Sequence, residues 1–260
     1  YLGEYVPEHN ERLQWISGFS GSAGMAIILA DRAAIFVDGR YTIQMKQQVA
    51  SELYEYHHLI DETPIAWLKK QLPSGHIGVY SRLHSYKWFK DTSAECSAAG
   101  LSLLELPSNS IDDNWHDRPV PERQLATLLD SRFTGEQSSA KRQRIGAAIQ
   151  AAGADVALIT QLDSIAWLLN IRGNDVPRLP VLLATATLKT DGSMTLFTDP
   201  AKIPNDLSLH VGDGVTVEDQ ASISAALRSL AEQNVLTDPS NTNAFTPVSY
   251  THLTLPTTPY

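Results

Sequence analysis

The chain has 260 residues, of which 43% are hydrophobic and 19% charged, so it can bury an ordinary core and is not a disordered segment. Its formal net charge of −9, without any Lys/Arg-rich run, argues against nucleic acid or an anionic membrane surface as a partner. No apolar run reaches the length of about 18 residues that crosses a membrane. The single cysteine, Cys96, excludes an intrachain disulfide and is compatible with a cytoplasmic location.

The best-defined pattern of the first half extends from Trp15 to Tyr41. It begins with WISGFSGSAG, whose three glycines recur at every third position and allow positive φ and close backbone approach. Two short apolar runs follow, 25–29 and 33–37, and are typical of a β-hairpin. The second run ends at the sequence DGRY (38–41), directly before a helical pattern. Because strand-to-helix junctions often carry ligand-binding side chains, DGRY is a candidate binding element.

Strand and helix patterns alternate along both halves of the chain. Strands are also predicted over 53–60, 76–80, 101–106, 156–160, 181–188, 194–198, 215–217 and 234–237. Helices are predicted over 11–16, 42–49, 64–72, 85–99, 138–152, 162–169 and 222–233. The third of these helices has the strongest start signal, with Thr63 as N-cap and Pro64 at the first helical position. This alternation predicts an α/β fold.

The domain organisation follows from a change in composition. A polar stretch rich in Pro and Asp, 107–122, is interpreted as an interdomain linker, so we predict two domains, 1–120 and 121–248. Residues 249–260 are Thr/Pro-rich without periodicity and resemble read-through of cloning or sequencing sequence, so we interpret them as a foreign or unstructured tail. The chain opens at Tyr1 rather than at a methionine, and we expect an upstream segment to be missing.

The residues do not form a self-contained catalytic set. The glycine stretch lacks both GK[ST] and GxGxxG, which favours a structural turn over a phosphate cradle, and no GxSxG nucleophile elbow is present. The cluster Asp112, Asp113, His116 and Asp117 has metal-binding residue types. Metal ligands need rigid, supported positions, so a solvated linker with a salt bridge to Arg118 is the favoured interpretation. None of the eight histidines forms an HxxxH or HExxH pair.

Arg40 is the candidate binding side chain of the first half. The predicted helix would place it in the first turn, where the helix dipole opposes a cation, so we expect a carboxylate partner. Two alternatives remain open: an intramolecular pair with Asp38, or an arginine that faces a carbonyl or carboxylate of a ligand through its planar fork. In the second half, the segment 163–175 (DSIAWLLNIRGND) is either a helix exit closed by an Arg–Asp pair or a rim that faces another domain or a substrate.

Three segments together resemble one family. WISGFSGSAG with the downstream VDGRY, the linker NWHDRP, and LDSIAWLLNIRGNDV are similar to the N-terminal part of the three-domain Xaa-Pro aminopeptidases (aminopeptidase P). The resemblance implies two tandem creatinase N-terminal-like domains, each a mixed β-sheet flanked by helices, without the pita-bread domain that carries catalysis. It also implies that the whole protein is a hydrolase, a metalloaminopeptidase that releases the N-terminal residue from peptides with proline at position two.

The resemblance also implies roles for individual parts. Two divalent metal ions, usually manganese, are expected in the missing catalytic domain, so this chain alone should hold no metal, no cofactor and no catalytic residue and should be inactive. Arg40 is implied as a substrate-binding residue, with Asp38 and Tyr41 as support that orients it. For Arg172 and Asp175 we expect only a role at a domain interface.

The partners implied by the resemblance are proline-containing peptides, the protein's own C-terminal catalytic domain and a second copy in a homodimer, with no nucleic acid and no membrane. One alternative is that the chain forms the N-terminal domains of a non-enzymatic pita-bread-type protein that binds peptides or histones. Another is a creatinase or prolidase relative that acts on a different amide. The DGRY sequence favours the peptidase over the binding protein, and the WISGFSGSAG and NWHDRP matches favour it over the creatinase or prolidase relative.

Overall fold

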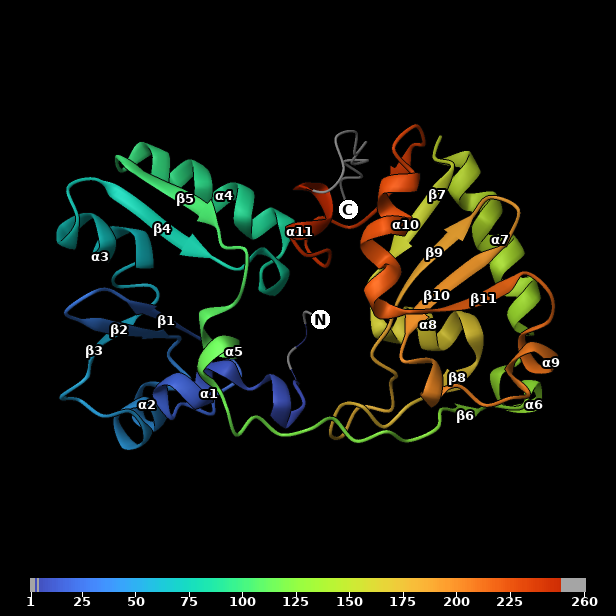
Figure 1. Cartoon of the computed structure of the whole chain (residues 1–260), viewed down its shortest axis with the longest axis horizontal. Helices are drawn as coiled ribbons and strands as arrows, with labels where there is room; N and C mark the ends of the chain where they lie inside the picture. Colours follow the sequence, from blue (N-terminus) through green and yellow to red (C-terminus); the bar gives the residue numbers. More distant parts are fainter. Residues whose placement is uncertain (1–2, 4, 249–260) are drawn as a thin grey trace. The chain divides into compact units, whose positions relative to one another are not determined.

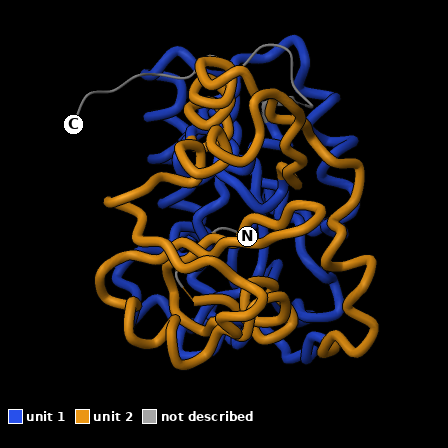
Figure 2. Tube along the Cα trace, turned by 90° about the vertical axis from the view of Figure 1, so that its left-hand side faces the viewer, with its two compact units in different colours: residues 1–2, 82–87, 121–260 blue, residues 3–81, 88–120 orange. Residues whose placement is uncertain are grey.

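The computed structural model describes residues 3 and 5–248 of the chain (Figure 1). The chain forms two compact units, which Figure 2 shows in separate colours. Unit 2 comprises residues 3–81 and 88–120, and unit 1 comprises residues 82–87 together with the chain from 121 onward. The predicted tail, 249–260, lies outside the described residues. Within the described residues, no helix is both long and apolar enough to cross a membrane.

Unit 2 contains a three-stranded mixed sheet and a separate pair of parallel strands (Figure 1). The sheet has the order β1 (Gly24–Ile28), β2 (Ala33–Val37) and β3 (Tyr54–His58), with β1 antiparallel and β3 parallel to β2. The parallel pair consists of β4 (Gly75–Val79) and β5 (Leu101–Glu105). The helices are α1 (Arg12–Ser17), α2 (Thr42–Gln48), α3 (Pro64–Gln71), α4 (Tyr86–Ala98) and α5 (Ser110–Asn114), with 3-10 turns η1 (Glu8–Asn10) and η2 (Ser81–Leu83). The last two residues of η2 and the first two of α4 belong to unit 1.

The core of unit 2 is built around β2. This strand is an unbroken apolar run because both of its faces are covered. Ile35 and Val37 pack in one cluster with Phe19, Met45, Val49 and Tyr54. Ala34 and Phe36 pack in the other with Trp67, Leu68, Cys96 and Leu101. The strand that leads into DGRY is therefore held from both sides, which fixes the position of the turn that follows it.

Unit 1 contains a five-stranded mixed sheet. Its order is β11 (Val215–Asp219), β10 (Met194–Thr198), β9 (Thr185–Lys189), β7 (Val156–Ile159) and β12 (Val235–Leu236). The two outer pairs are parallel and the two inner pairs antiparallel. A short ladder joins β6 (Thr127–Leu128) to β8 (Ile171–Arg172). The helices are α6 (Ser131–Thr134), α7 (Ser138–Ala151), α8 (Leu162–Leu169), α9 (Leu207–Val211), α10 (Ile223–Ser229) and α11 (Phe245–Val248), with 3-10 turns η3 (Pro200–Lys202) and η4 (Gln220–Ser222).

Helix α7 packs closely on the β9–β10 hairpin of unit 1. A Cβ at Gly146 would lie 2.6 Å from the Thr190 carbonyl oxygen, so only glycine allows this approach. The neighbouring Arg142 is buried and donates hydrogen bonds to the Gly192, Val211 and Asp213 carbonyl oxygens at 2.6, 2.9 and 2.9 Å. These bonds explain how a guanidinium is tolerated in the interior although burial lowers its pKa.

The prediction and the structure differ clearly in three places. The strand predicted over 181–188 begins only at Thr185, because the backbone of Leu183 bonds to side chains rather than to a neighbouring strand. The Leu183 N–H donates to the Asp175 carboxylate, and the Leu183 carbonyl oxygen accepts from the Thr198 hydroxyl. Helix α10 ends at Ser229, because the following N–H groups bond three residues back, as in turns. The linker contains α5, whose Asn109 cap accepts from two backbone N–H groups.

Candidate functional site

The glycine stretch connects α1 to β1 in unit 2. Helix α1 ends at Gly18, which adopts the left-handed conformation with φ of 79°. Gly21 is required for a different reason, because a Cβ there would lie 2.3 Å from Phe19 Cζ and 2.9 Å from Tyr41 Cδ1. The stretch is thus a tight turn packed around the buried Phe19 ring, as the interpretation from sequence favoured.

Polar side chains join this turn to helix α2. Ser20 donates from its backbone N–H to Gln48 Oε1 at 3.0 Å, and its hydroxyl accepts from Gln44 Nε2 at 3.1 Å. The Ser22 hydroxyl lies 2.8 Å from the Tyr41 hydroxyl. Because β2 runs directly into the DGRY turn and α2, these contacts connect the glycine stretch to the candidate binding element.

The DGRY turn holds Arg40 against Asp38. The Arg40 backbone N–H donates to Asp38 Oδ1 at 2.9 Å, and Arg40 Nη2 donates to Asp38 Oδ2 at 2.6 Å. The hydrogen bond from the Arg40 side chain is the main reason why the pKa of Asp38 lies below its ordinary value. On another side, Arg40 Cζ lies 5.2 Å from the centroid of the Tyr41 ring.

The structure corrects the expected position of Arg40. Helix α2 begins at Thr42 with Tyr41 as its N-cap, so Arg40 lies before the helix rather than in its first turn. The intramolecular pair with Asp38 exists, yet the Arg40 side chain remains 66% exposed. Its guanidinium is therefore oriented by a carboxylate and also accessible to solvent, a combination that suits recognition of a carbonyl or carboxylate.

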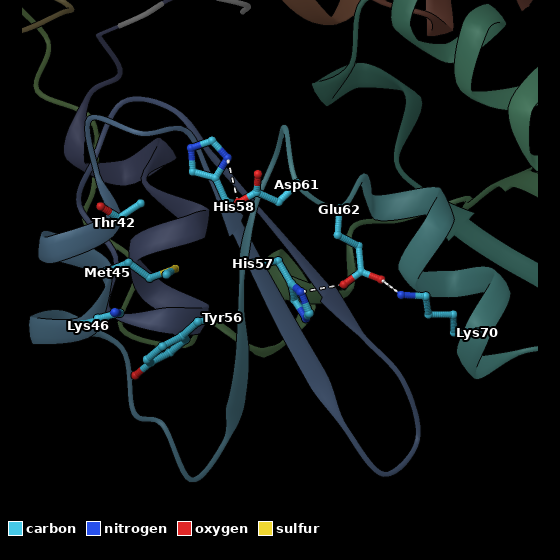
Figure 3. A pocket seen from close by; sticks show the side chains of 9 residues that line it. All are labelled: Thr42, Met45, Lys46, Tyr56, His57, His58, Asp61, Glu62 and Lys70. Carbon is cyan, nitrogen blue, oxygen red and sulfur yellow. Dashed lines mark hydrogen bonds and ion pairs between the residues drawn. The ribbon is translucent and has the colours of Figure 1, made fainter.

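A concave site of about 470 Å³ opens nearby in unit 2, between α2 and the segment that joins β3 to α3 (Figure 3). Several of its charged groups pair with one another. Glu62 Oε1 accepts a hydrogen bond from Lys70 Nζ at 2.5 Å, and Glu62 Oε2 lies 2.9 Å from His57 Nδ1. The hydrogen bond from Lys70 is the main reason why the pKa of Glu62 lies below its ordinary value. The His57 ring stacks on Phe36 at 4.9 Å. These contacts hold the Glu62 carboxylate between Lys70 and His57, and they do not by themselves define a ligand.

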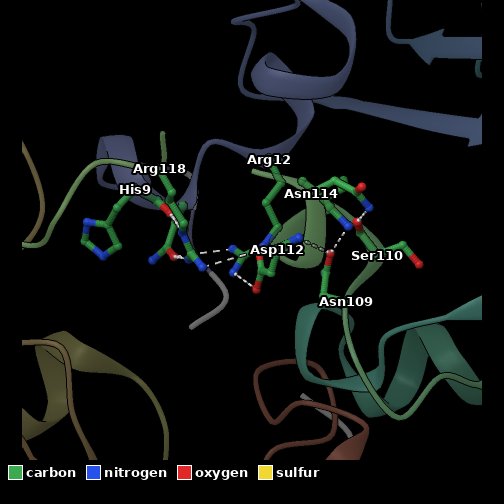
Figure 4. Close-up of polar contacts among 9 residues, drawn as sticks. His9, Arg12, Asn109, Ser110, Asp112, Asn114 and Arg118 are labelled. Carbon is green, nitrogen blue, oxygen red and sulfur yellow. Dashed lines mark hydrogen bonds and ion pairs between the residues drawn. The ribbon is translucent and has the colours of Figure 1, made fainter. Parts of the chain in front are cut away.

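Asp112, one of the linker residues with a metal-binding side chain, is the centre of an ion-pair cluster, in line with the favoured interpretation from sequence (Figure 4). Asp112 Oδ1 accepts from Arg12 Nε at 2.7 Å and lies 3.3 Å from Arg118 Nη1. Arg118 Nε also donates to the His9 carbonyl oxygen at 2.6 Å. The Arg118 pair was expected, whereas Arg12 was missed because it lies 100 residues away from Asp112 in sequence. Among the described residues, no group of three or more His, Cys, Asp or Glu could hold a metal ion.

The segment 163–175 in unit 1 is also organised by a partner that its own sequence does not contain. The Asp175 side chain is only 3% exposed and pairs with Lys202 Nζ at 2.6 Å. Arg172 Nη1 donates to the Ile171 carbonyl oxygen at 2.8 Å. The alternative of a helix exit closed by an Arg–Asp pair is therefore wrong, since Asp175 pairs with Lys202. The left-handed residue here is Asn170, with φ of 53°, and its side chain accepts from buried Lys141 Nζ at 2.7 Å.

The two units are α/β domains of a known kind. Profiles of the creatinase/prolidase N-terminal domain match residues 5–106 and 117–253. The chain belongs to the creatinase/prolidase N-terminal domain family. The predicted fold class, two tandem domains of this type with mixed α/β structure, is thereby confirmed.

The relatives of the chain are more specific. It is 34% identical over 214 residues to Xaa-Pro aminopeptidase ApepP of Drosophila melanogaster, and the matched stretch covers 81% of this chain and 35% of that protein. It is 32% identical over 251 residues to aminopeptidase P2 of Arabidopsis thaliana, and the matched stretch covers 94% of this chain and 35% of that protein. The crystal structure of X-prolyl aminopeptidase from Caenorhabditis elegans, described as a cytosolic enzyme with a di-nuclear active site, matches with a TM-score of 0.86 and 26% identity over 93% of this chain and 41% of that one.

These matches confirm the predicted resemblance to the N-terminal part of Xaa-Pro aminopeptidases. The chain spans about 35% of the length of the two relatives from fly and plant.

Proposed function

We propose that this chain is the N-terminal portion of a metal-dependent Xaa-Pro aminopeptidase and that Arg40 binds the peptide substrate. The observation that supports this role is the DGRY turn itself: Arg40 is fixed by Asp38 at 2.6 Å while its side chain stays 66% exposed. The proposal is supported by relatives that are Xaa-Pro and X-prolyl aminopeptidases. A planar guanidinium can donate two parallel hydrogen bonds to a peptide carbonyl or terminal carboxylate.

Catalysis is proposed to lie outside this chain. The relatives extend well beyond the matched part, and the relative from C. elegans is described as having a di-nuclear active site. The described residues contain no ligand group that fits such ions. We therefore propose that two divalent ions, manganese by preference, are bound in a C-terminal catalytic domain, where they would activate the attacking water. The role of this chain is to shape the substrate side of the site.

The first test is on activity. The parent gene should encode five metal ligands downstream of residue 248, two Asp, one His and two Glu, and the full-length enzyme should cleave Xaa-Pro peptides. The purified 260-residue chain should not cleave them, with or without manganese. Turnover by the purified chain would overturn the proposed location of catalysis, and loss of the five ligands would favour the non-enzymatic binding protein.

The second test is on Arg40 in the full-length enzyme. Arg40→Ala should raise KM by about tenfold to a hundredfold with a smaller change in kcat, since charged hydrogen bonds contribute about 1.5–3 kcal/mol. Arg32→Ala is a matched control in the same unit, because Arg32 is also partly exposed and also pairs with a nearby aspartate, Asp31. Equal kcat/KM for the Arg40 variant and the wild type would remove Arg40 from the site.

Further properties of the full-length protein are part of the same proposal. We propose domain boundaries near residues 120 and 248, a homodimer and a cytoplasmic location. The location is supported by the description of the C. elegans relative as cytosolic. Light scattering of the full-length protein after gel filtration would test the dimer, and limited proteolysis would test the boundaries.

A further inference from the structure

The surroundings of Tyr41 in unit 2 form a continuous series of contacts that ends at Arg40. Phe19 is buried at 1% exposure and meets the Tyr41 ring edge to face, with centroids 5.8 Å apart and planes at 86°. The backbone at Gly21 lies so close to both rings that no side chain fits there. One side of the Tyr41 ring is therefore fixed by packing rather than by a hydrogen bond.

The far end of the same ring is fixed by a hydroxyl pair. The Tyr41 hydroxyl lies 2.8 Å from the Ser22 hydroxyl, which comes from the glycine stretch. At its backbone end, Tyr41 donates its N–H to the Asp38 carbonyl oxygen at 3.1 Å. The ring is thus held at its edge, at its hydroxyl and at its backbone, and rotation about its side-chain bonds would break at least one of these contacts.

Arg40 rests on the ring that these contacts hold. Its Cζ lies 5.2 Å from the Tyr41 centroid, and its Nη2 donates to Asp38 at 2.6 Å. Long exposed side chains lose rotamer freedom when they bind, and a side chain that is already ordered loses less. A guanidinium placed between a fixed carboxylate and a fixed ring is therefore preorganised for binding.

We propose that Ser22 is a positioning residue for substrate binding, which acts through the Tyr41 ring on Arg40. This inference rests on the proposed function of Arg40, and it gives the glycine stretch a role in placing the Ser22 hydroxyl. The stretch brings the Ser22 hydroxyl to the Tyr41 hydroxyl, and Gly21 leaves room for the two rings. Ser22 does not need to touch the peptide, and its effect should appear in KM rather than in kcat.

The test in the full-length enzyme uses matched hydroxyl variants. Ser22→Ala and Tyr41→Phe should each raise KM for an Xaa-Pro peptide by about two- to tenfold with kcat unchanged, the range expected for one neutral hydrogen bond. Ser22→Thr keeps the hydroxyl and should restore the wild-type KM. The double variant should show no more than the larger single effect, because both remove the same bond. Ser97→Ala is the control, since that hydroxyl donates to the Ser93 carbonyl oxygen of its own helix, away from the DGRY turn in sequence.

A second measurement does not depend on activity. In the 260-residue chain, the Arg40 Nε–H NMR signal should exchange with water severalfold faster in Ser22→Ala and Tyr41→Phe than in the wild type, and Ser97→Ala should leave it unchanged. If Arg40→Ala raises KM but neither hydroxyl variant changes KM or Nε–H exchange, the inference about Ser22 is overturned and the function of Arg40 stands. If Arg40→Ala leaves KM unchanged, the proposed function fails, and accelerated exchange would still show that Ser22 orders Arg40. A change in kcat alone, or failure of Ser22→Thr to restore KM, would indicate a purely structural role.

Discussion

The ion-pair cluster at Asp112 gives the sharpest prediction of stability. Asp112 accepts from Arg12 Nε and Nη2 at 2.7 and 2.8 Å, and its side chain is only 27% exposed. Asp112→Ala would leave the Arg12 side chain, 14% exposed, with a weak bond to Asn10 at 3.3 Å. Charged hydrogen bonds contribute about 1.5–3 kcal/mol, and breaking a buried pair costs about 3–5 kcal/mol. Discounted for partial exposure, the expected loss of stability is about 2–3 kcal/mol.

The assay is urea unfolding followed by circular dichroism, with hydrogen exchange of the α1 amides to locate the change. A loss of about 2–3 kcal/mol shifts the midpoint by about 1–2 M urea for a typical slope. Asp113→Ala is the matched control, because Asp113 is the next residue of α5 and is exposed, and its carboxylate accepts from the Ser108 hydroxyl rather than from an arginine. The control should change stability by less than about 0.5 kcal/mol.

The pH dependence of the same variant has a definite sign. Burial raises the pKa of Asp112, but the hydrogen bonds and charges of Arg12 and Arg118 outweigh burial and hold the pKa below its ordinary value. The carboxylate therefore contributes its full stability above the unfolded pKa of about 3.9, and the contribution disappears as pH falls through the lower, folded pKa. The difference between wild type and Asp112→Ala should shrink below about pH 4. Equal stability of the Asp112 and Asp113 variants at pH 7 would refute the reasoning.

Two further predictions concern unit 1. Burial lowers the pKa of His84 to about 4. Between this pH and about 6.5, the unfolded chain therefore binds more protons than the folded chain. The stability of the segment that pairs residues 84–86 with 242–244 should fall as the pH drops through that interval. His84→Gln should flatten this pH profile in hydrogen exchange of residues 242–244; an unchanged slope would contradict it. Gly146→Ala should destabilise unit 1 by about 1–3 kcal/mol in urea unfolding, because the new Cβ would lie 2.6 Å from the Thr190 carbonyl oxygen. The control Ala147→Gly, at the next position of α7, should cost no more than about 1 kcal/mol. Equal losses of stability in the two variants would argue against the close contact.

Sequence signals predicted the elements that local chemistry determines. Thr63 accepts from the Ala66 N–H and Pro64 opens α3, and Gly18 ends α1 in the left-handed conformation. The strand β10 has the bounds predicted, because apolar residues and the Asp191-Gly192 turn mark its start. Each of these signals lies within a few residues of the element that it defines.

The features that were missed depend on distant partners. Arg12 is 100 residues from Asp112, and Lys202 is 27 residues from Asp175. No residue near Asp175 in sequence indicates a pair with Lys202, whereas the nearby Arg172 suggests an Arg–Asp pair as one of the two alternatives. No sequence signal indicates a role for Ser22, whose hydroxyl contacts that of Tyr41, 19 residues away, through the fold of the hairpin. The candidate binding residue could be predicted from sequence, but its surroundings required the structure.

The geometry of DGRY explains why Arg40 can be tested separately from folding. An exposed ion pair contributes little to stability, because solvent screens it and two side chains must be ordered. Asp38 also stabilises the turn through backbone donors. Its carboxylate accepts from the Arg40 N–H, and its carbonyl oxygen accepts from the Tyr41 N–H. Both bonds can form with any non-proline side chain at position 40. The buried strand β2 and the ring packing of Phe19 fix the turn from the other side. The loss of the Arg40 side chain should therefore leave the turn in place, and a change in KM can be assigned to the missing guanidinium.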